Sequence, residues 1–174
     1  MNLLMVQRIL GLMLLLFSVT MLPPVGVSLA YGDGHYGPFL ESFVIIAAVG
    51  ALLWLPVHRV RRDLRLRDGF LVVAAFWISL AFAGATPLLL SDVPQLSLTD
   101  AVFEAVSGFT TTGATVIGGL DDLPKSSLYY RQQIQWLGGM GVIVLAVALL
   151  PVLGIGGMSL YKAETPGPIK DQKL

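Results

Sequence analysis

Cysteine is absent from this sequence of 174 residues, and histidine occurs only twice, at His35 and His58. Without cysteine there is no disulfide framework, no thiolate metal site and no cysteine nucleophile. The two histidines lie far apart in the chain, which argues against a histidine-based metal site. An intramembrane enzyme would need a nucleophile with its base, or a metal pair, and the apolar segments offer neither. We therefore do not expect an enzyme.

Charged residues are also scarce: they make up 13% of the chain, hydrophobic residues make up 55%, and the formal net charge is zero. A mean hydropathy of +0.78 is typical of a membrane protein rather than of a soluble domain. The zero net charge gives no reason to expect a nucleic-acid partner, and basic and aromatic residues do not alternate. The partner expected from composition is the lipid bilayer.

Four apolar segments are long enough to cross a bilayer, at residues 9–31, 39–57, 69–90 and 128–150. Pro23 and Pro24 interrupt the first segment, and we expect them to bend or end its helix near the outer membrane surface. The third segment is expected to end around Pro87. A cleaved signal peptide is an alternative for the first segment, with residues 12–22 as its apolar core, but the paired prolines favour a retained helix.

Basic residues predict the orientation of these segments. Five arginines fall between residues 59 and 67, and such a loop is retained on the cytoplasmic side. Four crossings then place both termini in the cytoplasm, with nine basic residues inside and only Lys125 and Arg131 outside. Acidic residues concentrate on the outer half, where they form either a vestibule that attracts cations or an ordinary solvated surface.

Residues 101–117 are too polar to face lipid and too apolar for an exposed loop, although they lie between two predicted spans. A short helix is predicted at about 99–108, with Asp100 in its first turn and Ser97 or Thr99 as its cap. Such a helix rises about 15 Å, which is half of the bilayer core. We therefore expect this half-helix to end inside the membrane.

The segment that follows, 110–115, is a run of threonines interrupted by a glycine and an alanine. Irregular backbone at membrane depth is tolerated only where protein buries it or where it lines a water-filled cavity. A half-helix whose C-terminal end faces exposed carbonyls can strip water from a monovalent cation. We therefore interpret 110–115 as a potassium-type selectivity filter that needs no cofactor, with K+ as the transported ion.

Within this filter, the carbonyls of Thr111 and Thr112 are the expected K+ ligands, with Thr110 at the inner end and Ala114 toward the outer end. A strand of converging carbonyls requires unusual dihedral angles, and Gly113 can adopt positive φ at no steric cost. An ordinary loop glycine is the alternative. The segment contains no acid, and neutral oxygens without carboxylates suit a monovalent ion better than a divalent one.

Two further groups of residues are candidates for supporting or gating the filter. Glu104 would be a lone carboxylate at membrane depth, which is costly, so we expect it to pair with Arg131 as a brace behind the filter. The alternative is that Glu104 reaches the outer water. Gly138, Gly139 and Gly141 lie midway along the last span, where they provide either a gating hinge or close helix packing.

The spacing from Gly108 to Thr115 also resembles a phosphate-binding P-loop. Ala114 stands where that motif has its lysine, and no predicted strand precedes the segment. We therefore do not expect nucleotide binding here.

Residues 100–115, DAVFEAVSGFTTTGAT, resemble the first pore loop of the TrkH and TrkG type of bacterial potassium uptake proteins, within the wider potassium transporter superfamily. RDGF at 67–70, RQQIQWLGGMGVIVLAVALLP at 131–151 and LYKAETPGPIKDQKL at 160–174 resemble the corresponding stretches of that family. The resemblance is collinear over essentially the whole chain. It also argues against a signal peptide, because the family begins with an uncleaved helix pair.

The resemblance implies an all-α membrane protein with a transmembrane helix pair at 1–68 and one membrane-pore-membrane unit at 69–153. Residues 154–174 would form a cytoplasmic segment leading toward a second unit. Four such units surround one ion path in this family, so we expect this chain to be part of a longer protein; assembly of four copies is the alternative. Gly113 matches the filter glycine of the family, whereas Thr115 stands where potassium channels carry a second glycine, which implies looser selectivity.

By the same resemblance we expect potassium transport, by a channel or a symporter, across the bacterial inner membrane. The partners implied are the remaining pore units, a second copy in a homodimer, and a cytoplasmic nucleotide-binding regulatory subunit. A membrane scaffold that retains the pore fold without conducting ions is the alternative function.

Overall fold

The structure is a computed structural model that describes residues 3–60 and 66–152. Every regular element within these two ranges is helical, which confirms the all-α class for this part of the chain. The chain divides into two compact units, Met1–Gly139 and Met140–Leu174, and the first carries the elements that matter below. The predicted cytoplasmic segment 154–174 lies outside the described residues.

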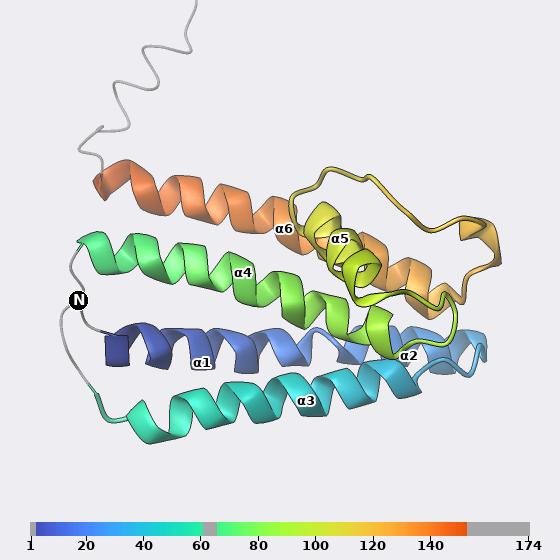
Figure 1. The fold of residues 1–174 in the computed structure, drawn as a ribbon, viewed down its shortest axis with the longest axis horizontal. Helices are drawn as coiled ribbons and strands as arrows, with labels where there is room; N and C mark the ends of the chain where they lie inside the picture. Colours follow the sequence, from blue (N-terminus) through green and yellow to red (C-terminus); the bar gives the residue numbers. More distant parts are fainter. Residues whose placement is uncertain (1–2, 61–65, 153–174) are drawn as a thin grey trace, which may run out of the picture. The chain divides into compact units, whose positions relative to one another are not determined.

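The first predicted span consists of two helices. α1 covers Leu3–Val19 and α2 covers Leu22–Tyr31, and the chain turns between them (Figure 1). The expected interruption of the first helix is present, but it falls at Thr20 and Met21, and Pro23 and Pro24 lie in the first turn of α2 rather than at the end of α1. Proline suits that turn, since its missing N–H would have no partner there and its φ is already helical.

The next two helices follow the predicted second and third spans. α3 covers Gly37–Trp54 and continues as a 3-10 helix, η1, at Leu55–Val57, and α4 covers Leu66–Leu90. α4 ends at Leu90, as the predicted span does, and Pro87 lies inside the helix one turn before that end. A proline removes one helical hydrogen bond, but neighbouring elements compensate in membrane helices, and Pro87 is fully buried.

Among the described residues, three helical stretches are long and apolar enough to cross a membrane: Leu3–Tyr31, Gly37–Val57 and Asp68–Leu90. They correspond to the first three predicted spans. The fourth falls in α6, Lys125–Val152, whose side chains are described only as far as Gly141. That span stays a prediction.

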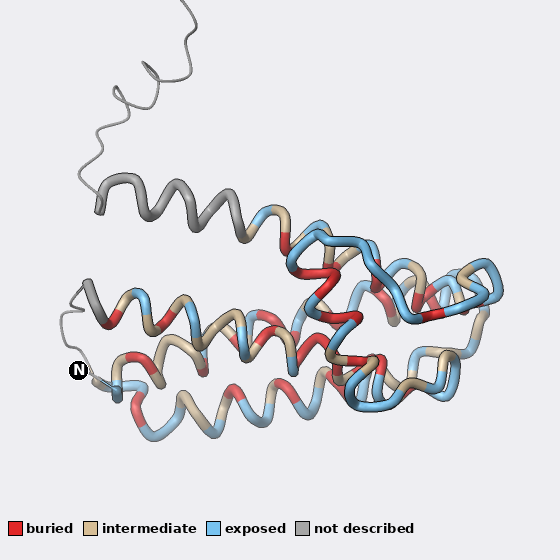
Figure 2. The backbone as a smooth tube through the Cα atoms, turned by 45° about the horizontal axis from the view of Figure 1, so that its top comes forward, coloured by how far each residue is buried: buried red, intermediate tan, exposed pale blue. Residues whose placement is uncertain are grey.

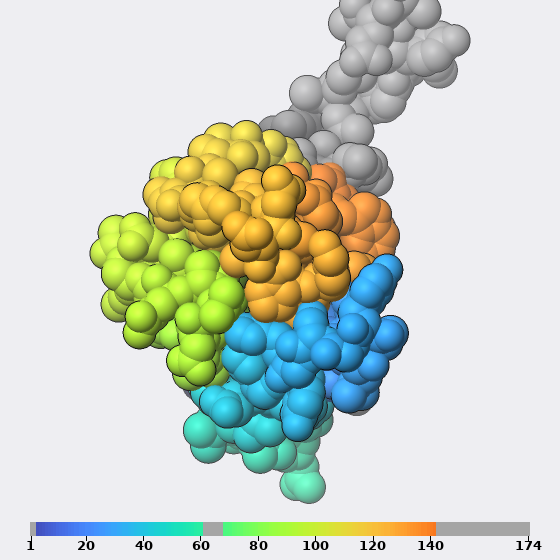
Figure 3. All heavy atoms as spheres, turned by 90° about the vertical axis from the view of Figure 1, so that its right-hand side faces the viewer, coloured from blue at the N-terminus to red at the C-terminus, as the bar shows by residue number. Residues whose placement is uncertain are grey.

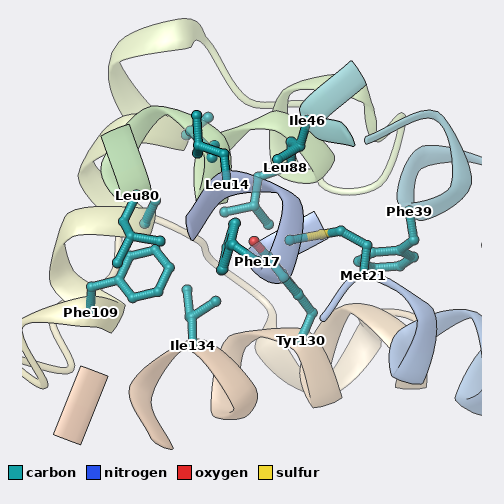
Figure 4. Packing of buried hydrophobic residues seen from close by; sticks show 14 residues of the cluster. Leu14, Phe17, Met21, Phe39, Ile46, Leu80, Leu88, Phe109, Tyr130 and Ile134 are labelled. Atoms are coloured by element: carbon teal, nitrogen blue, oxygen red, sulfur yellow. The ribbon is translucent and has the colours of Figure 1, made fainter. Parts of the chain in front are cut away.

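α1, α3 and α4 pack side by side around buried apolar side chains (Figures 1 and 4). α1 and α3 approach closely at Gly11 and Gly50, where a Cβ on Gly50 would lie 2.9 Å from the backbone nitrogen of Leu15. Tyr130, at the start of α6, is buried in the same core and donates a hydrogen bond of 2.7 Å to the carbonyl of Gly84 in α4. The core therefore joins the N-terminal helices to the two helices that flank the candidate filter.

α5 covers Leu98–Phe109, and a 3-10 helix, η2, covers Leu120–Asp122. Figure 3 views the first unit from the end at which the chain passes from α2 to α3. At this end, the loop between α2 and α3 lies beside the loops before and after α5. Two hydrogen bonds hold the loop between α2 and α3 in this position. Asp33 Oδ2 accepts from the backbone N–H of Ser126, at the start of α6, at 2.9 Å, and His35 Nε2 lies 2.7 Å from Ser91 Oγ, in the loop after α4.

Asp33 is the centre of this loop contact. Partial burial opposes its ionisation, but hydrogen bonds from Ser28, Ser126 and His35 outweigh that effect and lower the pKa of Asp33 to about 2. The carboxylate is therefore charged at neutral pH and holds the start of α6 against the turn after α2.

Candidate functional site

α5 begins at a side-chain cap. The hydroxyl of Ser97 accepts from the backbone N–H of Asp100 at 3.2 Å and donates to the Asp100 carboxylate at 2.7 Å. Of the two predicted caps, Ser97 is the one used. The helix is 12 residues long, so it rises about 18 Å, and it contains the predicted 99–108 with one more residue at each end.

The end of α5 closes in a Schellman motif. The N–H of Thr111 bonds the carbonyl of Gly108, and the N–H of Thr112 bonds the carbonyl of Ser107, both at 2.9 Å. This motif places its closing residue in the left-handed region, and Thr111 has φ 55°. Thr111 is the only non-glycine residue with positive φ in the part of the chain that the structure describes. Glycine usually holds this position, because a β-branched side chain is strained there.

The chain then runs without regular structure from 112 to 119, and the side chains of 110–116 are exposed (Figure 2). Gly113 has φ 75°, as the filter hypothesis requires. Within the described residues, the carbonyl oxygens of Thr111, Thr112 and Gly113 accept no hydrogen bond. The Ala114 carbonyl differs, because it accepts a hydrogen bond of 2.6 Å from the hydroxyl of Ser107 in α5. That bond turns the Ala114 oxygen back toward the helix.

The carboxylate of Glu104 binds the end of this segment, at Thr115 and Val116. Its Oε1 accepts from the hydroxyl of Thr115 at 2.6 Å and from the backbone N–H of Val116 at 2.7 Å. Its Oε2 lies 3.0 Å from Nη2 of Arg131 in α6. Glu104 is buried, so it does not reach the outer water, and the predicted pairing with Arg131 is confirmed.

The three glycines of the last span differ in their surroundings. Gly138 lies against the backbone of Phe109, since a Cβ built on it would be 2.1 Å from the Phe109 carbonyl oxygen. A Cβ on Gly139 would make an ordinary contact, 3.7 Å from Cγ2 of Thr111. Gly141 belongs to the second unit. Close packing therefore explains Gly138, and a hinge at these glycines stays a prediction.

The roles of three further residues, Ser107, Thr115 and Gln133, were not predicted from the sequence. Ser107 anchors the Ala114 carbonyl, and Thr115 bonds Glu104. Gln133, on α6, donates a hydrogen bond of 2.7 Å to the carbonyl of Thr20, where α1 and α2 separate. Only Thr115 carried a signal in the sequence, as the residue in place of a second glycine.

A family model described as "TrkH: Cation transport protein" matches residues 35–174. The chain belongs to the TrkH family. It is 57% identical, over all of its residues, to "Trk system potassium uptake protein TrkH" of Halomonas elongata, and it covers 36% of that protein. Over 97% of the chain it is 47% identical to "Trk system potassium uptake protein TrkG" of Escherichia coli.

A solved member of the TrkH family has the same fold. The crystal structure of the potassium transporter TrkH from Vibrio parahaemolyticus matches 95% of this chain with a TM-score of 0.85 and 54% sequence identity. The chain covers 34% of that protein. The chain therefore spans about a third of the length of the TrkH relatives it matches.

Proposed function

We propose that this chain supplies one of four selectivity-filter loops in a potassium transport protein of the bacterial inner membrane. The observation that carries the proposal is the row of carbonyls at Thr111, Thr112 and Gly113, which the described residues leave without donors next to the C-terminal end of α5. Family membership supports potassium as the ion, because relatives of this chain are named potassium uptake proteins.

K+ would lose its water to these carbonyl oxygens. The partial negative charge at the C-terminal end of α5 favours a cation there. Thr111 and Thr112 would supply the main ligands, with Gly113 above them and Thr110 at the inner end. Ala114 would contribute less than the sequence suggests, since its carbonyl bonds Ser107.

The loop completes a site only with partners. One face of 110–115 is held by Glu104 and Ser107, while its side chains are otherwise exposed. We propose that three further filter loops, from the remaining pore units of a longer protein, cover that exposed face and close the ion path. The homodimer and the nucleotide-binding regulatory subunit implied by the resemblance are part of the same proposal.

The proposed membrane placement follows from length and charge. α5 rises about 18 Å, which ends it part-way through a hydrocarbon core of about 30 Å. We propose that it re-enters the membrane from the outer side. The five arginines between residues 59 and 67 support the proposal that both ends of this chain lie on the cytoplasmic side.

The test joins this chain to the part of the Vibrio parahaemolyticus TrkH that follows its match, giving a protein of family length, here called the fusion protein. It is expressed in bacteria that lack other potassium uptake systems. We expect growth at low external K+ and uptake of K+ by the cells. No uptake by a fusion protein present in the membrane would contradict the proposal.

Gly113→Ser in the fusion protein separates a conducting filter from a scaffold. Serine at φ 75° is strained, so a conducting loop should lose K+ uptake or its discrimination against Na+. A scaffold should tolerate the change. Gly118→Ser is the matched control, because Gly118 lies in the same segment, has open space around its Cα and does not have positive φ.

A further inference from the structure

Gly138 of α6 lies against the last residue of the filter half-helix. A Cβ built on Gly138 would lie 2.1 Å from the carbonyl oxygen of Phe109, 2.6 Å from its carbonyl carbon and 2.7 Å from its Cα. All three atoms belong to the backbone, so rotation of a side chain could not make room. Any residue other than glycine at 138 must therefore displace the backbone at this contact, in α5 or in α6.

The end of α5 cannot simply move away from α6. The ring of Phe109 packs over Gly84 of α4, where a built Cβ would lie 2.5 Å from Cε2. The same ring lies 5.8 Å from that of Phe17 between centroids, and Phe109 is 2% exposed. Figure 4 shows Phe109 enclosed among Phe17, Leu80 and Ile134. Helices on both sides therefore fix this residue.

A displacement at Phe109 reaches the filter within two or three residues. Thr111 and Thr112 close the last turn of α5 through hydrogen bonds of 2.9 Å to the carbonyls of Gly108 and Ser107. Their peptide planes are therefore set by the same turn that contacts Gly138. The peptide planes that carry these two N–H groups also carry the carbonyls of Thr110 and Thr111, so the same turn decides where those two carbonyls point.

We propose that Gly138 is a positioning residue for the filter: it lets the backbone of α6 lie directly against the Phe109 carbonyl and so sets how well the loop discriminates between ions. The proposal rests on the proposed function and extends it to a residue that does not touch the ion. A close-packed interior transmits a small displacement to neighbouring atoms instead of absorbing it, so a shift at Phe109 reaches the filter loop.

The experiment compares Gly138→Ala with Gly139→Ala in the fusion protein. Both changes replace a glycine of the same helix by alanine, so both raise helix propensity equally. A Cβ on Gly139 makes only an ordinary contact, 3.7 Å from Thr111 Cγ2. The measurements are the KM for K+, the maximal rate of uptake, and the inhibition of K+ uptake by Na+.

We expect Gly138→Ala to change the KM for K+ or the discrimination against Na+ by about ten-fold, as misplacement of binding groups by a fraction of an ångström can do. Gly139→Ala should stay within about two-fold of the parent. A Gly138→Ala protein that reaches the membrane in normal amounts with both quantities unchanged would overturn the proposal. A purely structural role would lower the amount of protein without changing either quantity.

If the Gly138→Ala protein does not accumulate in the membrane, Gly84→Ala is tested instead, because a Cβ on Gly84 would lie 2.5 Å from Cε2 of the same Phe109. The same change in discrimination supports the proposal, and unchanged discrimination overturns it. If this chain does not supply a filter loop at all, Gly113→Ser leaves K+ uptake unchanged as well. That result distinguishes failure of the proposed function from failure of the proposal about Gly138.

Discussion

Glu104 of α5 and Arg131 of α6 form an ion pair, with 3.0 Å between Oε2 and Nη2 and side-chain exposures of 2% and 10%. The second oxygen of the same carboxylate accepts hydrogen bonds from Thr115 and Val116 of the filter segment. One side chain therefore joins the half-helix, the segment after it and the following helix. Because both charges are buried, each depends on the other.

The first prediction concerns this pair. Glu104→Gln leaves Arg131 buried without a counter-charge, and Arg131→Gln does the same to Glu104, so each change should lower the free energy of unfolding by about 3 kcal/mol. The double variant should cost less than the sum of the two, because it leaves no unpaired charge. Thermal unfolding of the purified fusion protein measures all three. Additive losses would show that the two side chains are not energetically coupled.

Thr111 provides the second prediction. Its φ of 55° strains a threonine by about 1–2 kcal/mol, and a glycine costs about 0.5–1 kcal/mol through added freedom of the unfolded chain, so Thr111→Gly should raise the free energy of unfolding by up to about 1 kcal/mol. Thr112→Gly is the control, since Thr112 does not have positive φ and its replacement should cost about 0.5–1 kcal/mol through added freedom of the unfolded chain. Equal destabilisation by both changes would mean that Thr111 is not strained.

The crossing of α1 and α3 gives a third prediction. A Cβ on Gly50 would meet the backbone of Leu15 at 2.9 Å and of Gly11 at 3.0 Å, so Gly50→Ala should destabilise the protein by about 2 kcal/mol. Gly26→Ala in α2 meets open space and should be neutral or stabilising by up to about 1 kcal/mol. Unfolding measurements on both variants test this, and equal effects would argue against a close crossing.

The lowered pKa of Asp33 predicts that the stability of the protein falls at low pH. The pKa of Asp33 is lowered from 3.8 to about 2, so its stabilising effect is present above pH 3.8 and is lost as the pH falls through about 2. Asp33→Asn should cost about 1 kcal/mol at neutral pH, and the difference from the parent should shrink across that window. Asp92→Asn, at an exposed position of the loop after α4, should show no such difference. A constant cost of Asp33→Asn down to pH 2 would contradict the assignment.

Several features of the fold followed from the sequence because they depend on local chemistry. Ser97 and Asp100 mark the start of α5, and the predicted 99–108 lies within the observed Leu98–Phe109. The expense of a lone carboxylate in an apolar region pointed to Arg131 as a partner of Glu104, with exposure of Glu104 to the outer water as the alternative, and the structure shows the pair. Apolar length alone located the first three spans.

Other features required the tertiary structure. Pro23 and Pro24 were expected to bend or end the first helix, but prolines are equally compatible with the first turn of a new helix that begins after the break. Pro87 lies inside α4, and whether neighbours compensate its lost hydrogen bond cannot be read from a single segment. The contact of Gly138 with Phe109 joins residues that are far apart in sequence, so the sequence favoured close packing over a hinge but could not identify the partner.

The central claim is that the carbonyls at Thr111–Gly113 face an ion path, and Thr112→Cys tests it most directly. This chain has no cysteine, so any cysteines in the rest of the fusion protein are replaced first. A small water-soluble thiol reagent is then applied from outside, with and without saturating K+. Gln95→Cys, at an exposed position before α5, is the control.

We predict that K+ slows modification of Thr112→Cys and leaves modification of Gln95→Cys unchanged. Modification of Thr112→Cys at the same rate with and without K+, or no modification from the aqueous side at all, would contradict the account.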